Sequence, residues 1–213
     1  MPSFSSSRRF PFSIPRLLGY TFFFFVLAGC ATQPTVVPTV DWQTHQASLQ
    51  QLNHYQANGK LGYRGKQRFG ANLLWRSAPQ ADHLLLTNFL GKTLLKLDAT
   101  PLRVTLVSHD GATHRGTNAS ALIRQLTDIN LPVEQMRDWL IGLPTAADTY
   151  KLNDDNRVAY LAKQIDDQRW QLDYNDYDTS VTPALPKRMV LSQGSVKITL
   201  VINEWQLPNK HQQ

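Results

Sequence analysis

The stretch VKITLVIN, residues 196–203, decides the fold class of this 213-residue chain, because apolar and polar side chains alternate along it. Its even-numbered positions carry Val, Ile, Leu and Ile, whereas its odd-numbered positions carry Lys, Thr, Val and Asn. A period of two is typical of a β-strand that buries one face. The sequence therefore predicts a strand that continues to residue 205, with one apolar face.

The same period recurs in both directions from this stretch. Short turns separate the repeats, and His109-Asp110-Gly111 is typical of a hairpin. Such a pattern predicts a mainly β chain with an antiparallel meander. The segment 174–188, rich in Tyr, Asp and Pro, is predicted to be a long ordered loop. The further predicted strands begin at residue 59 and include 68–75, 83–88, 93–99, 103–108, a strand near 150, 158–165, 170–174 and 189–192.

Three segments have the helical period of 3.6 instead. The first is predicted to run from residue 42 to about residue 54, with Asp41 as its N-cap. The other two follow each other without an intervening strand, one at 119–127 behind Asn118 and a short one that begins at Pro132. They form an apolar helical insert that can cover one face of the sheet.

The first 29 residues have the composition of a secretory signal, with basic residues followed by an apolar run and small residues. Leu27-Ala28-Gly29-Cys30 resembles the bacterial lipobox, which implies an S-diacylglyceryl group and an N-acyl group on Cys30. The only cysteine of the chain stands there. Two alternatives are an ordinary signal with a chance cysteine and a transmembrane helix, although the run of about 13 residues is shorter than the ~20 that span a bilayer.

These features predict a domain plan and a location. We expect a signal peptide at 1–29, a lipidated flexible tether at 30–40, one folded domain at 41–207 and a C-terminal tail at 208–213. Ala31, rather than an aspartate, follows Cys30, which favours residence in the outer membrane through a lipid anchor on the periplasmic face. No charged residue occurs at 31–40, and two prolines there favour an extended tether.

Charge and composition argue against nucleic acid as a partner. Three of the 22 Lys and Arg residues and none of the 16 acidic residues precede Cys30, so the formal charge falls from +6 to +3 in the mature chain. No stripe of basic residues with interleaved aromatics is present. A mild positive charge suits a protein that works beside anionic lipid.

The residue pattern does not indicate an enzyme active site or a metal site. The chain contains no nucleophile motif, no P-loop and no cluster of His, Cys and Glu with metal-ligand spacing. Acidic pairs such as Asp154-Asp155 and Asp166-Asp167, and the acidic residues at 173–178, could in principle bind calcium, but turns explain them better. We therefore expect no catalytic residues, no metal and no cofactor other than the lipid on Cys30.

Several stretches together resemble the LolB family, the outer-membrane acceptors of lipoproteins. The resemblance extends from about Trp42 to Leu207, with one departure, since Phe89 stands where the family pattern leads us to expect proline. The stretches that carry it are Leu85-Leu86-Thr87-Asn88, Leu90-Gly91, residues 95–97, Trp139-Leu140-Ile141-Gly142-Leu143-Pro144, Asp148, residues 150–152, Asp173-Tyr174, Tyr177, Leu185-Pro186, Met189 and the last strand.

The resemblance implies an open, incomplete β-barrel with helices covering its mouth. It also implies a monomer that takes lipoproteins from a LolA-type periplasmic carrier, holds their acyl chains and places them in outer-membrane phospholipid. A lipid-anchored envelope scaffold without acyl-chain transfer is the alternative function, and an envelope hydrolase is weaker because no active site is evident.

Two sets of residues are candidates for this function. Phe89 and Leu90 stand between two predicted strands, where a polar turn is usual, and the resemblance implies a membrane-insertion loop with Leu90 at the position of the family's leucine. The alternative is that both fold back onto the sheet. The candidates for the wall of an acyl-chain cavity are Phe69, Leu73, Trp75, Leu84, Leu86, Leu95, Leu97, Met136, Trp139, Leu140 and Ile141.

Overall fold

The computed structural model describes residues 40–127, 131–165 and 167–208. The predicted signal peptide, the predicted lipidation site Cys30, the predicted tether up to residue 39 and the tail beyond residue 208 lie outside the described residues. Among the described residues, no helix combines the length and the apolar character needed to cross a bilayer.

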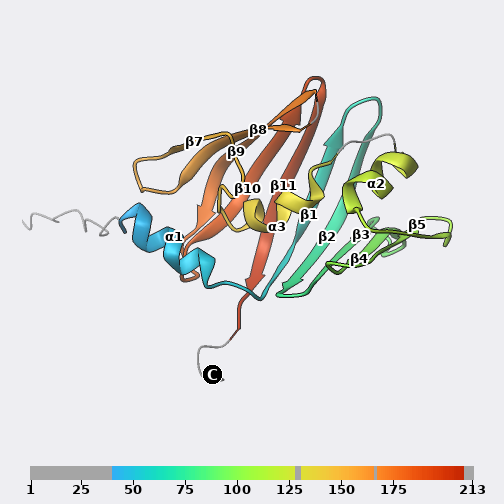
Figure 1. Ribbon diagram of the computed structural model, residues 1–213, viewed down its shortest axis with the longest axis horizontal. Helices are drawn as coiled ribbons and strands as arrows, with labels where there is room; N and C mark the ends of the chain where they lie inside the picture. Colours follow the sequence, from blue (N-terminus) through green and yellow to red (C-terminus); the bar gives the residue numbers. More distant parts are fainter. Residues whose placement is uncertain (1–39, 128–130, 166, 209–213) are drawn as a thin grey trace, which may run out of the picture. The chain divides into compact units, whose positions relative to one another are not determined.

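The chain forms helices and strands in an order close to the predicted one (Figure 1). The first half contains α1 (Trp42–Gln50), β1 (Tyr55–Arg64), β2 (Arg68–Ala78), β3 (Ala81–Thr87), β4 (Thr93–Ala99), β5 (Val104–Ser108) and β6 (Thr113–Gly116). The second half contains α2 (Ala119–Thr127), α3 (Val133–Leu140), β7 (Thr149–Leu152), β8 (Val158–Ile165), β9 (Gln168–Asp178), β10 (Leu185–Gln193) and β11 (Val196–Gln206).

The strands form a single antiparallel sheet in the order β6-β5-β4-β3-β2-β1-β11-β10-β9-β8-β7. Pairing of β1 with β11 joins the two halves, with Leu61 opposite Leu200 and Tyr63 opposite Ile198. The edge strands β6 and β7 do not pair with each other, so the sheet stays open. The prediction of a mainly β chain with an open antiparallel sheet and covering helices is confirmed.

The antiparallel topology gives the sheet two ends. One end, which we call the tip end, holds the connections β1–β2, β3–β4, β5–β6, β8–β9 and β10–β11. The opposite end holds the connections β2–β3, β4–β5, β7–β8 and β9–β10. Helix α1 lies at the opposite end, because Trp42 contacts Tyr150 of β7 with ring centroids 5.9 Å apart. The two ends therefore carry different loops and different chemistry.

Alternation along the strands places the core on the inner face of the sheet. Ala71, Leu73 and Trp75 of β2 are buried, whereas Asn72 and Arg76 are exposed on the outer face. Figure 1 shows α3 against the middle of the sheet and α2 nearer to β3–β5. Trp139 and Leu140 of α3 are fully buried, so this helix forms part of the core.

The predicted end of the first helix and the predicted loop at 174–188 are both wrong. Helix α1 ends at Gln50 rather than near residue 54, and Tyr55 already belongs to β1, where it pairs with Ser77. The predicted loop at 174–188 is mostly strand, because β9 continues to Asp178 and β10 begins at Leu185. Its Asp and Asn residues are typical of turns, but here they lie mainly on the outer face or at strand ends, where their side chains reach water.

Candidate functional site

An apolar cavity lies between the inner face of the sheet and the α2–α3 insert. Strand register builds one wall, because Leu73 pairs with Leu86 and Trp75 pairs with Leu84. Helices α2 and α3 build the opposite wall. The lining residues are Leu61, Tyr63, Phe69, Leu73, Trp75, Leu84, Leu86, Leu95, Ile123, Thr127, Leu131, Val133, Met136, Leu140, Leu191, Ile198 and Leu200.

The candidate wall residues fall into two groups. Eight of the predicted residues line this cavity, from Phe69 at its rim, 40% exposed, to Leu140 on α3. Leu97, Trp139 and Ile141 do not line it and are buried in the core instead. The cavity also uses residues that the sequence did not single out, among them Leu61 and Leu131. Leu61 shares a strand face with Gly59 and Tyr63, but Gly59 and Gly62 weaken the strand signal.

The cavity is small in this conformation. It encloses about 100 Å³, which is less than the roughly 150 Å³ of an engineered apolar cavity that binds benzene. A longer ligand would therefore fit only if the helices above the cavity moved. The attachment of those helices decides where movement is possible.

Polar bonds fasten α3 to the sheet at three places. The hydroxyl of Tyr55 on β1 donates to the carbonyl oxygen of Arg137 at 2.5 Å. The hydroxyl of Tyr174 on β9 donates to the carbonyl oxygen of Trp139 at 2.7 Å. The Arg137 guanidinium donates to the carbonyl oxygen of Ala78 at 2.7 Å and lies 3.5 Å from the Asp82 carboxylate. Burial raises the pKa of both tyrosines, which keeps them protonated as donors.

Helix α2 is joined to α3 through Ser120 and Glu134. The Ser120 backbone N–H donates to the Glu134 carboxylate at 3.0 Å, and the Ser120 hydroxyl bonds the same carboxylate. Leu122 and Ile123 are buried on the sheet side of α2. Apolar contacts thus hold α2 against the sheet, while directional hydrogen bonds to backbone carbonyls hold α3.

The β3–β4 connection presents two large apolar side chains to solvent. Phe89 is 88% exposed and Leu90 is 78% exposed, so the alternative in which both fold back onto the sheet is wrong. Asn88 fixes the turn, because its side-chain oxygen accepts from the N–H groups of Leu90 at 3.0 Å and Lys92 at 2.9 Å. Gly91 has a φ of 81°, a conformation that glycine adopts without strain. We call residues 88–92 the tip.

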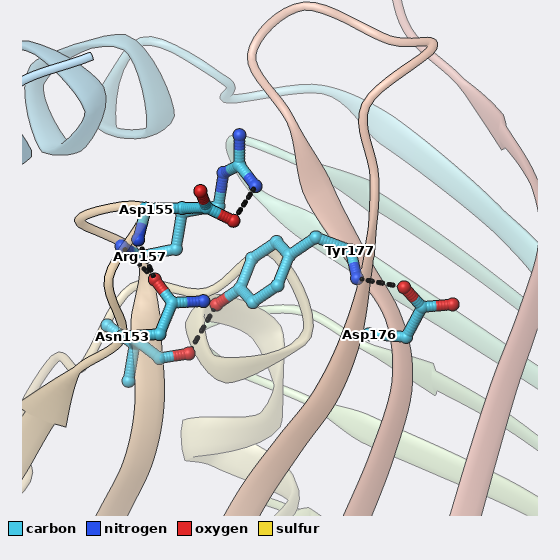
Figure 2. A network of polar contacts seen from close by, with 6 residues as sticks. Asn153, Asp155, Arg157, Asp176 and Tyr177 are labelled. Carbon is cyan, nitrogen blue, oxygen red and sulfur yellow. Dashed lines mark hydrogen bonds and ion pairs between the residues drawn. The ribbon is translucent and has the colours of Figure 1, made fainter. Parts of the chain in front are cut away.

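The acidic residues near the opposite end serve the local structure. The Asp155 carboxylate pairs with Arg157 at 3.3 Å, and the Tyr177 hydroxyl donates to the carbonyl oxygen of Val158 at 2.6 Å. Figure 2 shows Asp155 beside Arg157 and the ring of Tyr177 near them. The Asn153 side chain accepts from the Arg157 N–H at 2.9 Å, which closes the β7–β8 turn. Across the described parts of the chain, no group of three or more His, Cys, Asp and Glu side chains is arranged to hold a metal ion.

Comparison with known proteins agrees with this geometry. The family described as "Outer membrane lipoprotein LolB" matches residues 53–205. The outer-membrane lipoprotein LolB of Vibrio cholerae is 41% identical over 187 residues, which cover 85% of this chain and 91% of that protein. The LolB of Yersinia enterocolitica is 37% identical, with 84% and 90% covered.

Solved structures with very different sequences share the fold. A LolA superfamily protein from Nitrosomonas europaea has a TM-score of 0.52 at 7% identity, with 80% of this chain and 94% of that chain covered. A DUF1329 family protein from Desulfovibrio piger has a TM-score of 0.57 at 6% identity, with 79% and 91% covered. The family match spans most of the chain, and the chain belongs to the LolB family of outer-membrane lipoproteins.

Proposed function

We propose that the chain, anchored in the outer membrane by a lipid on Cys30, receives lipoproteins from a LolA-type periplasmic carrier and places them in the membrane. Acyl chains would occupy the cavity beneath α2 and α3. The observation that carries this proposal is a cavity with an apolar wall under a helical cover, in a chain of the LolB family. No step requires a nucleotide, a metal or a covalent intermediate.

Opening of the cover is the central step of this mechanism. Because hydrogen bonds from Tyr55 and Tyr174 hold α3, we assign the movement to α2. Each methylene that enters the cavity gains about 0.8 kcal/mol. A long acyl chain can therefore offset the loss of the contacts of Leu122 and Ile123 with the sheet.

Release would use the tip. Exposed apolar side chains on a rigid turn cost solubility, and such patches are typical of sites that contact membranes or apolar ligands. Insertion of Leu90 into the bilayer would gain about 1.5–3 kcal/mol. That gain is enough to orient a protein that is already tethered by lipid, and it is too small to anchor a free one.

One observation favours the alternative of an envelope scaffold, namely the small volume of the cavity. Binding of a fluorescent fatty acyl probe to the mature chain with Cys30→Ala separates the two functions. We expect saturable binding that lipoprotein cargo displaces. If no acyl ligand binds, the scaffold function stands and the acceptor function is wrong.

In cells, depletion of the protein provides the second test. The acceptor function predicts that lipoproteins accumulate on the periplasmic carrier when this chain is removed. Normal sorting of lipoproteins after complete depletion would refute it. As a control for indirect damage to the envelope, production of the lipidated chain in the depleted cells should restore lipoprotein sorting.

A further inference from the structure

Three cations form a row across neighbouring strands at the tip end of the sheet. Arg64 of β1 pairs with Arg68 of β2 on one side and with Lys197 of β11 on the other. Residues that pair directly across antiparallel strands share a face and lie close together. All three are exposed, and their neighbours Tyr63 and Ile198 are buried, so the row lies on the outer face. We call these three residues the basic row.

The basic row lacks neutralising acids within the described structure. Some other cations do have an acidic partner, as with Arg137 and Asp82 or Arg157 and Asp155. In the described parts of the chain, no carboxylate forms an ion pair with a member of the row. Like charges directly opposite each other destabilise a sheet. An arrangement that costs stability and has no internal partner indicates an external anion.

The surroundings of the basic row connect it with the tip. The row lines a surface hollow of about 450 Å³ together with Gly62 and Phe69. The adjoining hollow is lined by Gly70 and by Phe89 of the tip. Gly62 pairs with Gly70, so the two hollows meet where neither strand carries a side chain.

Hydrogen bonding fixes the position of the tip beside the row. The side-chain amide of Asn72, on the outer face of β2, donates to the carbonyl oxygen of Asn88 at 3.2 Å. The apolar tip and the basic row therefore lie on the same part of the outer face. This combination of apolar side chains and neighbouring cations is typical of proteins that bind an anionic membrane surface.

We propose that the basic row binds the phosphates of anionic phospholipids while the tip is inserted. This inference rests on the proposed function, because it assigns a lipid class to the same membrane contact. Arginine presents several N–H donors in a plane and pairs well with phosphate oxygens. Attraction of about 1 kcal/mol per cation near an anionic surface corresponds to about fivefold in affinity for each residue.

Vesicle binding of the mature chain with Cys30→Ala tests the inference. The variant carries R64Q, R68Q and K197Q, and the matched control carries R76Q, R103Q and K187Q, exposed residues toward the opposite end that remove the same charge. Vesicles of phosphatidylcholine alone are compared with vesicles containing equal parts of phosphatidylcholine and phosphatidylglycerol. The basic-row variant should lose about 100-fold of the preference for phosphatidylglycerol, and the control should retain it.

Stability provides an independent check that the variant folds. Removal of three adjacent like charges should raise the urea midpoint slightly, and raised salt should weaken vesicle binding of the parent chain but not of the variant. Equal preference for phosphatidylglycerol in variant and parent would overturn the inference. Unchanged vesicle binding with slower cargo uptake from the carrier would also overturn it, because the row would then contact protein.

The outcome separates this inference from the proposed function. Leu90→Glu should weaken binding to both kinds of vesicle, since the apolar contact does not depend on lipid charge. If Leu90→Glu binds and delivers cargo normally, the insertion function of the tip fails. If Leu90→Glu has the expected effect but the basic-row variant keeps the preference for phosphatidylglycerol, the insertion function of the tip is retained and the assignment of anionic lipid to the basic row fails.

Discussion

The hydroxyl of Tyr174 lies 2.7 Å from the carbonyl oxygen of Trp139, and this buried hydrogen bond joins β9 to the last turn of α3. Tyr174→Phe leaves that carbonyl without this donor. We expect the free energy of unfolding to fall by about 1–2 kcal/mol, as measured by urea denaturation.

Tyr160→Phe is the matched control for this prediction. The Tyr160 side chain is half-buried on β8, and its hydroxyl makes no hydrogen bond to another residue in the described structure. The control should change the urea midpoint little. Equal effects of the two substitutions would mean that the Tyr174 hydrogen bond does not restrain the helix.

A cross-link between β6 and α2 should prevent acyl binding. A Cβ atom placed on Gly116 would lie 3.3 Å from Cγ of Leu122, so cysteines at these two positions are close enough to test for a disulfide. In the Cys30→Ala chain, Gly116→Cys with Leu122→Cys should bind an acyl probe only after reduction. Binding that is equal in the oxidised and reduced states would exclude movement of α2 away from β6.

Acid should weaken the attachment of α1. His45 is buried beside Trp42, and burial, with a smaller contribution from the charge of Arg157, lowers its pKa below 6.5. Below pH 6.5 the unfolded chain binds the proton more readily than the folded chain, so stability falls as the pH decreases toward the folded pKa. His45→Gln should show a shallower decline between pH 7 and pH 5 in urea titrations, and equal slopes would contradict the assignment.

The sequence predicted the sheet well because the alternation of its strands is strong. In β2, the period of two separates the set that includes Phe69 and Leu73 from the neighbouring set, and the structure then shows that this set faces inward. The exposure of the tip could not be predicted in the same way, since it depends on how the Asn88 side chain binds the turn. The edge strand β6 was missed because a short, polar strand at a sheet edge lacks an apolar face.

The remaining differences arise from tertiary contacts. Trp139 carries the same apolar signal as Leu140, but its indole N–H donates to the carbonyl oxygen of Thr145 at 3.0 Å within the core. The segment 174–188 is mostly strand because β9 and β10 pair along it, with Leu185 opposite Asp178 and Met189 opposite Tyr174. Neither contact leaves a mark in local sequence periodicity.

The most direct test of the account is the rate at which Leu90→Glu delivers lipoprotein cargo from the carrier to liposomes. Its control is Leu102→Glu, because Leu102 is 87% exposed in the β4–β5 connection, at the opposite end of the sheet. Loss of about 1.5–3 kcal/mol of insertion energy predicts delivery at least tenfold slower for Leu90→Glu. Uptake from the carrier should be unchanged, and Leu102→Glu should deliver normally. Delivery by Leu90→Glu at the rate of the control would contradict the account.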